Sequence, residues 1–277
     1  MASTAARNTV TSTAARKAVT AASTVARNAN IKAVGGSTQA QRTGGAVAQS
    51  AAIDVLKGVG SSLQRNPLKG TDYILKPPTD TTTVLNVVDK TFGKLKDGVP
   101  NGVSIFRVDS PHKSGTTTNH FNIINSKTAK GLDTPAIYKN NKIYQALDHK
   151  PITDATYSVA KNYKTIGKVA KVGGRALTAL AIAGDAMDIY DSYKADGGKI
   201  GENTVVTSAG VAGSWAGGIG GSKLGAMGGA AIGTAICPGL GTLVGGIIGG
   251  LVGGVGGSIG GRVAGETTAK FAYDAYR

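Results

Sequence analysis

The chain has 277 residues, of which 42 are glycine and only 5% are aromatic, and this composition disfavours one conventionally packed enzyme core over the whole length. The formal net charge of +15 favours anionic partners, either nucleic acid or anionic lipid. The single cysteine, Cys237, excludes a disulfide framework within one chain and any metal site that needs several cysteines.

Residues 1–53 predict a mobile basic leader. They contain no aspartate or glutamate and consist mostly of alanine, serine and threonine, with scattered lysine and arginine. This composition is typical of an organelle transit peptide or of the leader of a protein exported by a specialised bacterial machine, and also of a plain disordered basic tail. Residues 54–83 then predict a linker with a short helix, which ends in the proline-rich stretch Leu75–Thr79.

Residues 84–150 predict a small antiparallel β-rich domain. The runs Val103–Val108 and His120–Ile124 are short, rich in residues that favour strands and separated by a polar loop. Residues 136–146 predict a β-hairpin, since two central asparagines tolerate the left-handed backbone of a tight turn. A helix is expected near residues 84–96.

Residues 151–200 predict basic amphipathic and apolar helices. Five basic side chains follow one another at spacings of three and four residues, which places them on one face of a helix. They are Lys161, Lys164, Lys168, Lys171 and Arg175. This face suits binding to an anionic membrane surface, although a solvated lysine face on a soluble helix is the plainer interpretation. Gly173 and Gly174 predict a break before a second helix, which is expected to end at Asp196–Gly198.

Residues 201–277 carry the most regular pattern of the chain, with a glycine at every fourth position in two rows. The helix-packing residues taken from this pattern are Gly213, Gly217, Gly221, Gly225, Gly229, Gly233, Gly241, Gly245, Gly249, Gly253, Gly257 and Gly261. In a helix of about 3.6 residues per turn, such a row forms a groove without side chains, through which two backbones can approach closely. The segment therefore predicts a glycine-zipper helical hairpin that turns at Pro238 and Gly239.

Each interior glycine disfavours a helix in water by roughly 0.8–1.0 kcal/mol relative to alanine, so either lipid or the packing of one arm on the other must compensate. Residues 239–261 carry no charge and, at about 1.5 Å per residue, would extend about 34 Å, enough for a bilayer core of about 30 Å. The first arm, residues 209–236, contains Lys223, which would have to face a pore lumen or a partner. A soluble hairpin zipped through its glycine faces is the alternative.

Three segments in and before the zipper carry a resemblance to a known group of proteins. They are Ala181–Tyr193, Asp196–Thr204 and Gly213–Gly217, and they resemble the glycine-zipper region of bacterial polymorphic toxins and secreted effectors. Phe106–His112 and Asn119–Ile123 are similar to a further piece of such toxins. The resemblance implies a toxin or effector that perturbs a target membrane, and it allows for a cognate immunity protein in the producing cell.

The histidines form a rival candidate site, together with two charged residues near the first of them. The group consists of His112, His120, His149, Arg107 and Asp109. In a hydrolytic toxin, one imidazole would act as base and another as acid, with Arg107 or Lys113 stabilising the developing charge. His112, His120 and Asp109 would alternatively bind a metal ion. Neither arrangement has a recognised spacing, so polar residues that close a loop are the favoured interpretation, and no enzyme is expected.

The predicted fold class is therefore α+β, with a mobile basic N-terminal leader, a small antiparallel β-rich central domain and a C-terminal glycine-zipper helical hairpin. We expect a secreted toxin or effector that docks its basic helix on anionic membrane lipids and inserts the hairpin. The hairpin would then form homo-oligomers through its glycine faces and open a pore or disrupt the membrane.

Such a protein would leave the producer through a specialised secretion system and act at the target-cell membrane. No cofactor or metal is expected, and nucleic acid is the less favoured partner. Two alternatives remain open at this point. One is a nuclease-like toxin with a site in residues 103–150, whose zipper serves translocation. The other is a structural or delivery component of an injection assembly.

Overall fold

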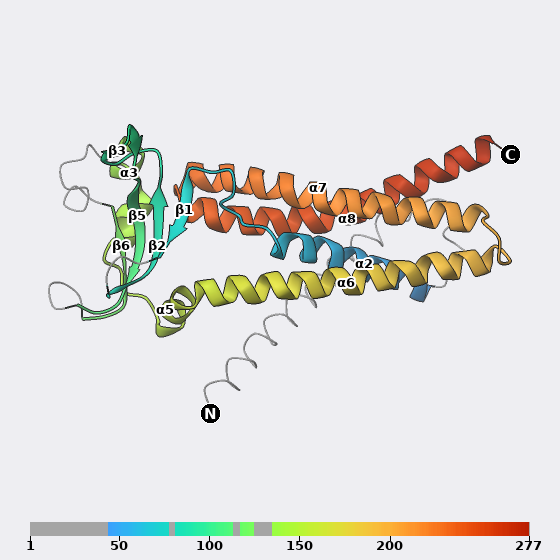
Figure 1. Cartoon of the computed structure of the whole chain (residues 1–277), viewed down its shortest axis with the longest axis horizontal. Helices are drawn as coiled ribbons and strands as arrows, with labels where there is room; N and C mark the ends of the chain where they lie inside the picture. The colour runs from blue at the N-terminus through green and yellow to red at the C-terminus, as the bar shows by residue number, and fades with distance from the viewer. Residues whose placement is uncertain (1–43, 78–80, 113–116, 125–134, 277) are drawn as a thin grey trace, which may run out of the picture. The chain divides into compact units, whose positions relative to one another are not determined.

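The computed structural model describes residues 44–77, 81–112, 117–124 and 135–276. Within these ranges the fold is α+β, as the sequence predicts, with a small antiparallel sheet and a C-terminal pair of long helices (Figure 1). Most of the predicted leader, residues 1–43, lies outside the described residues, and so does Lys113.

The chain divides into two compact units, which are described separately below. The helical unit contains residues 44–64, 173–224 and 251–276. The sheet unit contains the described residues between 65 and 172, together with residues 225–250. The two arms of the C-terminal hairpin therefore contribute to both units.

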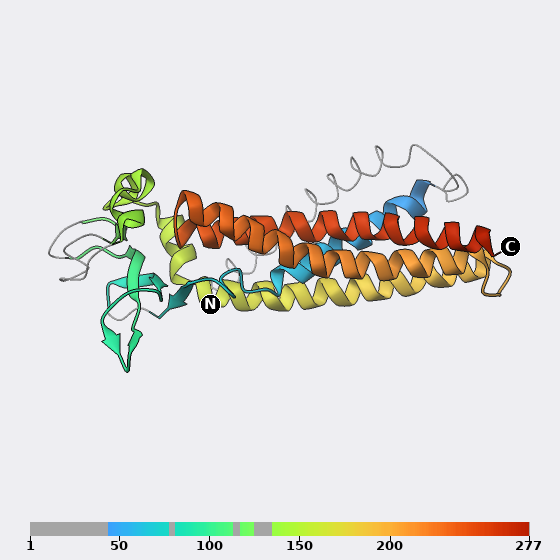
Figure 2. The same cartoon turned by 90° about the horizontal axis from the view of Figure 1, so that it is seen from above.

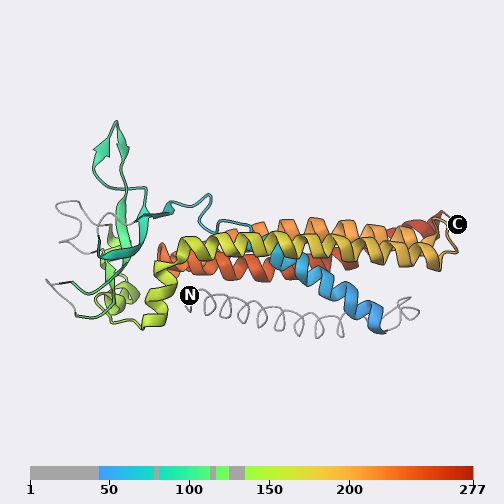
Figure 3. The same ribbon diagram turned by 60° about the horizontal axis from the view of Figure 1, so that its bottom comes forward.

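The helical unit is built from α2 and from parts of three long helices. The helices are Gly44–Leu63 (α2), Tyr163–Ala195 (α6), Glu202–Ile236 (α7) and Leu240–Ala275 (α8). In this unit α6, α7 and α8 run side by side, and α2 crosses them at an angle (Figures 2 and 3). Because α2 begins at Gly44, the boundary expected after residue 53 between leader and linker falls inside a helix. The division into five segments otherwise stays a prediction.

Small and apolar side chains bring α2 against its neighbours. Ala51, Val55 and Val59 lie four residues apart on one side of α2 and form a buried cluster with residues of α6 and α8. Contrary to prediction, Gly173 and Gly174 do not break α6. A Cβ at Gly174 would lie 2.8 Å from the carbonyl oxygen of Gly60, so this glycine allows close approach to α2 instead.

The sheet unit contains a four-stranded antiparallel sheet in the order β1-β2-β5-β6. In the same order its strands are Tyr73–Lys76, Thr83–Asp89, Val103–Asp109 and His120–Ile123, so the two predicted β runs coincide with β5 and β6. Leu95–Lys96 (β3) and Val99–Pro100 (β4) form a small hairpin that projects from this sheet (Figure 3). Val87, Ile105 and Phe106 are fully buried and lie at the centre of the core.

The helix expected near residues 84–96 is wrong, because most of this segment lies in β2 and in the turn after it. Val87 and Val88 are β-branched, which favours a strand, and they pair with residues of β5. Pairing and burial between neighbouring strands therefore stabilise a strand in this segment instead of the expected helix.

The β-hairpin expected at residues 136–146 is also wrong, because two short helices form instead: Ala136–Lys139 (α3) and Lys142–Leu147 (α4). The side chain of Asn141 accepts hydrogen bonds from the backbone N–H groups of Ile143 and Tyr144, so it caps α4 rather than forming a strand turn.

The turn between α7 and α8 belongs to the core of the sheet unit. Cys237 and Leu240 pack in this core, and the hydroxyl of the buried Tyr144 donates to the carbonyl of Pro238. Gly239 has a φ of 78°, and a Cβ there would lie 2.5 Å from the Cδ1 atom of Ile105. The predicted turn at Pro238 and Gly239 is therefore confirmed, and it requires glycine for both reasons.

The loop between α6 and α7 is organised by one carboxylate. Asp196 follows the end of α6, as predicted, and accepts hydrogen bonds from the backbone N–H groups of Asn203 and Thr204, at 3.2 and 2.7 Å. The hydroxyl of Thr204 donates to it as well, at 2.6 Å. Desolvation would raise the pKa of Asp196, but the hydrogen bonds from Thr204 and Asn203 outweigh it and lower this pKa to about 2. Asp196 therefore caps the start of α7 as an anion.

We expect Asp196→Ala to lower the free energy of unfolding by about 1 kcal/mol at pH 7, because the N–H groups at the start of α7 lose their acceptor. The folded-state pKa lies below the unfolded value of about 4, so the cap contributes fully above pH 4 and its contribution is lost between about pH 4 and pH 2. Urea unfolding across this range should show the difference from the unmodified protein shrinking. The exposed Asp191→Ala serves as control, and an equal loss of stability there would contradict the capping role.

Candidate functional site

The twelve glycines singled out in the sequence all lie where α7 faces α8. Within the helical unit, Gly213 faces Gly261, Gly217 faces Gly257 and Gly221 faces Gly253. Within the sheet unit, Gly225 faces Gly249, Gly229 faces Gly245 and Gly233 faces Gly241. Every pair is symmetric about residue 237, which is the register of an antiparallel hairpin with its turn there. A Cβ at Gly217, for example, would overlap the carbonyl oxygen of Gly257, so the contact is made by backbone against backbone.

Because glycine occupies this interface, the large apolar side chains of the hairpin point away from it. The exposed ones along the uncharged stretches include Ile219, Leu224, Met227, Ile232 and Ile236 on α7, and Val244, Ile247, Ile248 and Val252 on α8. Each of them is between 46% and 69% exposed, whereas helices of water-soluble proteins direct such side chains into the core. Lys223 is also exposed.

Among the described residues, α8 is a helix long and apolar enough to cross a membrane, and only 22% of its most apolar stretch is buried. It carries no charged side chain before Arg262. Length and composition alone do not separate a membrane span from a buried helix of a soluble protein, but a buried helix would not leave so much of its apolar surface exposed.

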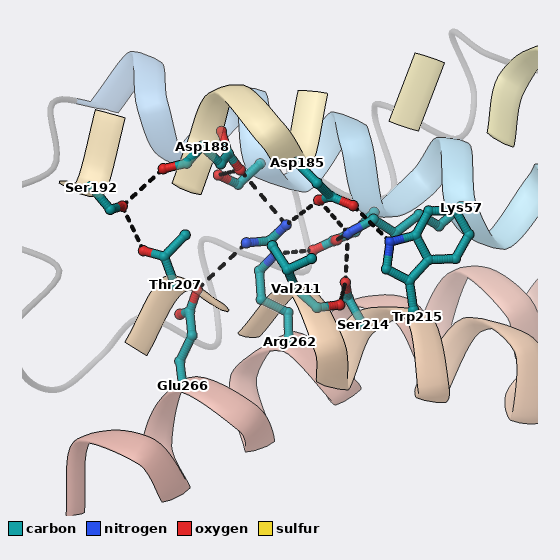
Figure 4. Close-up of polar contacts among 12 residues, drawn as sticks. Lys57, Asp185, Asp188, Ser192, Thr207, Val211, Ser214, Trp215, Arg262 and Glu266 are labelled. Atoms are coloured by element: carbon teal, nitrogen blue, oxygen red, sulfur yellow. Dashed lines mark hydrogen bonds and ion pairs between the residues drawn. The ribbon is translucent and has the colours of Figure 1, made fainter. Parts of the chain in front are cut away.

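A second feature of the helical unit was not predicted from the sequence. Six ionisable side chains from three helices meet in its interior, and we call them the buried charge cluster (Figure 4). They are Asp54 and Lys57 of α2, Asp185 and Asp188 of α6, and Arg262 and Glu266 of α8. Their side chains are between 0% and 13% exposed, so their charges are withdrawn from water.

Lys57 is the cation at one end of the buried charge cluster. Its Nζ atom lies 2.7 Å from Oδ1 of Asp185 and 3.1 Å from Oδ1 of Asp54, and it donates to the Ser214 hydroxyl at 2.6 Å. The same ammonium lies 5.5 Å from the centre of the Trp215 ring, a favourable cation–π distance. All its nearest partners are thus polar groups or an aromatic face, which compensate for its burial.

Arg262 is the second cation, and its guanidinium joins α8 to both α2 and α6. Its Nε donates to Oδ2 of Asp54 at 2.6 Å, and its Nη2 atom lies 3.5 Å from Oδ1 of Asp185 and 3.7 Å from Oδ2 of Asp188. On its own helix, Nη1 lies 3.6 Å from Oε1 of Glu266. A charged group buried so deeply is tolerated only while these carboxylates surround it.

Neutral polar groups complete the buried charge cluster. The indole N–H of Trp215 donates to Oδ2 of Asp185 at 2.7 Å, and the Ser50 hydroxyl donates to Oδ2 of Asp188 at the same distance. Because α7 supplies Ser214 and Trp215, all four helices of the unit take part. Such a network fixes how the helices face one another more than it adds stability, since the ion pairs must first offset the cost of desolvation.

The five basic residues expected on one helical face are all exposed, but they belong to two helices. Asp154–Lys161 forms α5, which ends at Asn162, and α6 begins at Tyr163. Lys161 is therefore the last residue of α5, while the other four, Lys164, Lys168, Lys171 and Arg175, lie on α6.

The structure brings the three histidines together in the sheet unit. The ring centres of His112 and His120 are 5.1 Å apart, and those of His120 and His149 are 5.8 Å apart with nearly parallel planes. The planes of the His112 and His120 rings are tilted by 40° to each other. In the part of the chain that the structure describes, no group of three or more histidine, cysteine or acidic side chains is arranged to hold a metal ion.

The two charged residues of the rival site, Arg107 and Asp109, form an ion pair with each other. Nη2 of Arg107 lies 3.1 Å from Oδ2 of Asp109, and the buried Asp109 also accepts hydrogen bonds from Thr83 and Asn122. These partners lie on neighbouring strands, so Asp109 has an evident structural role in the sheet.

Residues 198–260 match the family model described as the C13G5.2-like glycine zipper domain. The matched range covers the loop before α7, all of α7 and α8 as far as Gly260. No curated protein and no solved structure matches the chain. The predicted glycine zipper is thereby confirmed as a domain, and together with the apolar α8 it is compatible with insertion into a membrane.

The glycine contact can be tested with two adjacent positions of α8. Gly257→Ala should lower the free energy of unfolding by about 1–3 kcal/mol, because its Cβ overlaps the backbone of Gly217. At Gly256 a Cβ meets nothing within 4 Å, so Gly256→Ala should raise stability by up to about 1 kcal/mol through helix propensity. Urea unfolding of both variants measures the contrast, and effects of the same sign would contradict the backbone contact.

The buried charge cluster makes a separate prediction about stability. Arg262→Gln should cost about 3–5 kcal/mol, because the four buried carboxylates of the cluster then have Lys57 as their one remaining cation. Lys270→Gln, at a residue of the same helix, removes a more accessible ion pair with Glu202 of α7 and should cost much less. Chemical unfolding followed by the far-ultraviolet circular dichroism of the helices provides the comparison. Equal losses of unfolding free energy in the two variants would contradict a larger contribution from the buried ion pairs of Arg262.

Proposed function

We propose that this protein is a secreted effector of the toxin class that inserts its α7–α8 hairpin into an anionic target membrane and makes that membrane permeable. The observation that carries the proposal is the arrangement of the zipper, with backbone against backbone inside and large apolar side chains outside. In lipid, small residues at the helix interface and large apolar residues towards the acyl chains are the favoured arrangement.

The physical reason is that the same hairpin is less stable in water than in a bilayer. In water its glycines disfavour the helix and its outward isoleucine, leucine and valine side chains stay hydrated. In a bilayer core the helical hydrogen bonds become obligatory, because no water competes for the backbone, and the outward side chains are buried among acyl chains. The stretch of α8 before Arg262 has the length and composition for a span.

Binding to the surface comes before insertion, and the exposed basic residues of α5 and α6 fit this step. Lys161, Lys164, Lys168, Lys171 and Arg175 would each contribute about 1 kcal/mol at an anionic surface, less at high salt. Lys223 would face the water-filled lesion, because a lysine among acyl chains is costly.

Oligomers remain part of the proposal, but they would form through a surface other than the predicted one. The glycine faces of α7 and α8 are already occupied by each other within one chain. Hairpins from several chains would therefore associate through the outward apolar side chains, for example around Ile248 and Val252.

The effector class is proposed from the resemblance to polymorphic toxins together with the matched zipper domain. On this proposal, a specialised secretion system exports the protein, an immunity protein protects the producer, and damage needs no enzymatic step, cofactor or metal. The segments that carry the resemblance hold Asp185, Asp188, Ser214 and Trp215, so they supply much of the polar network in the helical unit.

The test is release of a trapped dye from anionic vesicles by the purified full-length protein, with a pair of matched variants. Val252 is 68% exposed on α8 and Leu95 is 71% exposed on β3, so an aspartate at either position should leave the fold intact. Val252→Asp should slow release at least tenfold, since an acidic residue at the centre of a span costs roughly 2.5–3.5 kcal/mol. Leu95→Asp should leave release unchanged.

Neutral vesicles and high salt should both reduce release by the unmodified protein, because the basic residues of α5 and α6 then lose their anionic partner. The proposal fails if the unmodified protein releases no dye from anionic vesicles, or if Val252→Asp releases dye as fast as Leu95→Asp.

A further inference from the structure

We propose that the buried charge cluster is an autoinhibitory latch, which holds the α7–α8 hairpin against α2 and α6 until an anionic bilayer offers Arg262 other partners. This inference rests on the proposed membrane function and adds to it a contact that restrains the hairpin in solution, besides the packing of its turn in the sheet unit.

The ion pairs of Arg262 with other helices connect the hairpin to α2 and α6. Asp54 comes from α2, and Asp185 and Asp188 come from α6, so the carboxylates that bind Arg262 from other helices lie outside the hairpin. Among the described residues, α7 contributes only neutral groups to the network. These bonds, too, run from the hairpin to α2 or α6, because Ser214 accepts from Lys57 and Trp215 donates to Asp185.

The hairpin stays together without the latch. Its glycine pairs join α7 directly to α8, and the partly exposed ion pair between Lys270 and Glu202, at 2.6 Å, also lies within it. Opening the buried charge cluster therefore removes the ion pairs that hold the hairpin to α2 and α6, leaves only the apolar packing around Val55 and Val59 on that side, and keeps the contacts between α7 and α8 intact.

Arg262 also lies at a favourable position along α8. It is the first charged residue after the long uncharged stretch that has the properties of a span. With that stretch in the acyl region, Arg262 comes to the level of the headgroups. Lipid phosphates there can accept two parallel hydrogen bonds from a guanidinium and so replace the carboxylates of α2 and α6.

The titratable and charged groups that face Arg262 come from α2, α6 and α8. They are Asp54 and Lys57 on α2, Asp185 and Asp188 on α6, and Glu266 on α8 itself. Asp54 and Asp185 each contact both cations, but Asp54 makes the shorter contact with Arg262, at 2.6 Å against 3.5 Å for Asp185. Asp54 is therefore the residue whose neutralisation should open the latch most effectively.

The chain contains its own reporter, because Trp215 is the single tryptophan and donates to Asp185 inside the cluster. Asp54→Asn removes charge from the cluster without replacing a direct partner of that indole. Glu202→Gln is the matched control, since it removes an ion pair of α8 that lies within the hairpin.

The experiment uses full-length protein and vesicles of either phosphatidylglycerol and phosphatidylcholine or phosphatidylcholine alone. Acrylamide quenching of Trp215 is measured in solution, and dye release is measured with both kinds of vesicle. For Asp54→Asn we expect stronger quenching in solution, at least fivefold faster release from anionic vesicles and a smaller dependence on the anionic lipid. Glu202→Gln should match the unmodified protein in all three measurements.

The milder Asp188→Asn, which alters the more distant 3.7 Å pair, keeps the test decisive if Asp54→Asn does not fold, as judged by circular dichroism. It should change release in the same direction by a smaller factor. If the unmodified protein releases dye but the folded variants release it no faster, or if their Trp215 is no more accessible, the latch is overturned while the membrane function stands. If neither the unmodified protein nor any variant releases dye, the membrane function fails and the latch with it.

Discussion

The contact on which the structure depends is the approach of the α7 and α8 backbones through two facing rows of glycine. Each pair along the interface, such as Gly221 with Gly253 or Gly229 with Gly245, brings a carbonyl group to the place where any other residue would carry its Cβ. The interface therefore leaves no room for side chains, and the larger apolar residues are turned outwards. From this one constraint follow the helical hairpin, its antiparallel register and its unusually apolar surface.

The buried charge cluster places a second constraint on the same helices. Glycine contacts are short and shape-specific, but they do not determine which other helices the hairpin meets. The ion pairs of Arg262 with Asp54 and Asp185 do so, because a misplaced partner would leave a charge buried without compensation. The glycine pairs thus hold the hairpin together, whereas the ion pairs and the apolar cluster around Val55 hold it to α2 and α6. This separation is what makes a regulated release of the hairpin physically reasonable.

The sequence predicts the zipper well because its signal is local and repeated. The four-residue period and the turn at Pro238 and Gly239 are visible without knowledge of any partner, and so are the β runs that become β5 and β6. The symmetry of both glycine rows about residue 237 would also have given the antiparallel register. By contrast, Gly173 and Gly174 predict a helix break, because the sequence does not show that α2 packs against α6 there. Residues 136–146 predict a β-hairpin, because the sequence does not show that Asn141 caps a helix.

The sequence does not predict the buried charge cluster, for a related reason. Two of its directly bonded members, Asp54 and Arg262, are 208 positions apart in the sequence, so nothing local indicates that they meet. A weaker sign was present, because Asp54 and Lys57, or Arg262 and Glu266, are spaced to share one face of an otherwise apolar helix. The histidines are the opposite case, since the sequence singles them out and the structure brings their rings together, but no metal-binding group forms among the described residues.

The most direct test of the central claim is whether the outward face of the hairpin contacts lipid. A fluorophore attached to Val252→Cys, in a Cys237→Ser background, can be read with anionic vesicles that contain nitroxide-labelled lipid, and Leu95→Cys provides the matched label in the sheet unit. We expect strong quenching of the label at residue 252 and weak quenching at residue 95. Equal quenching at the two positions, or none at residue 252, would contradict insertion of the zipper hairpin.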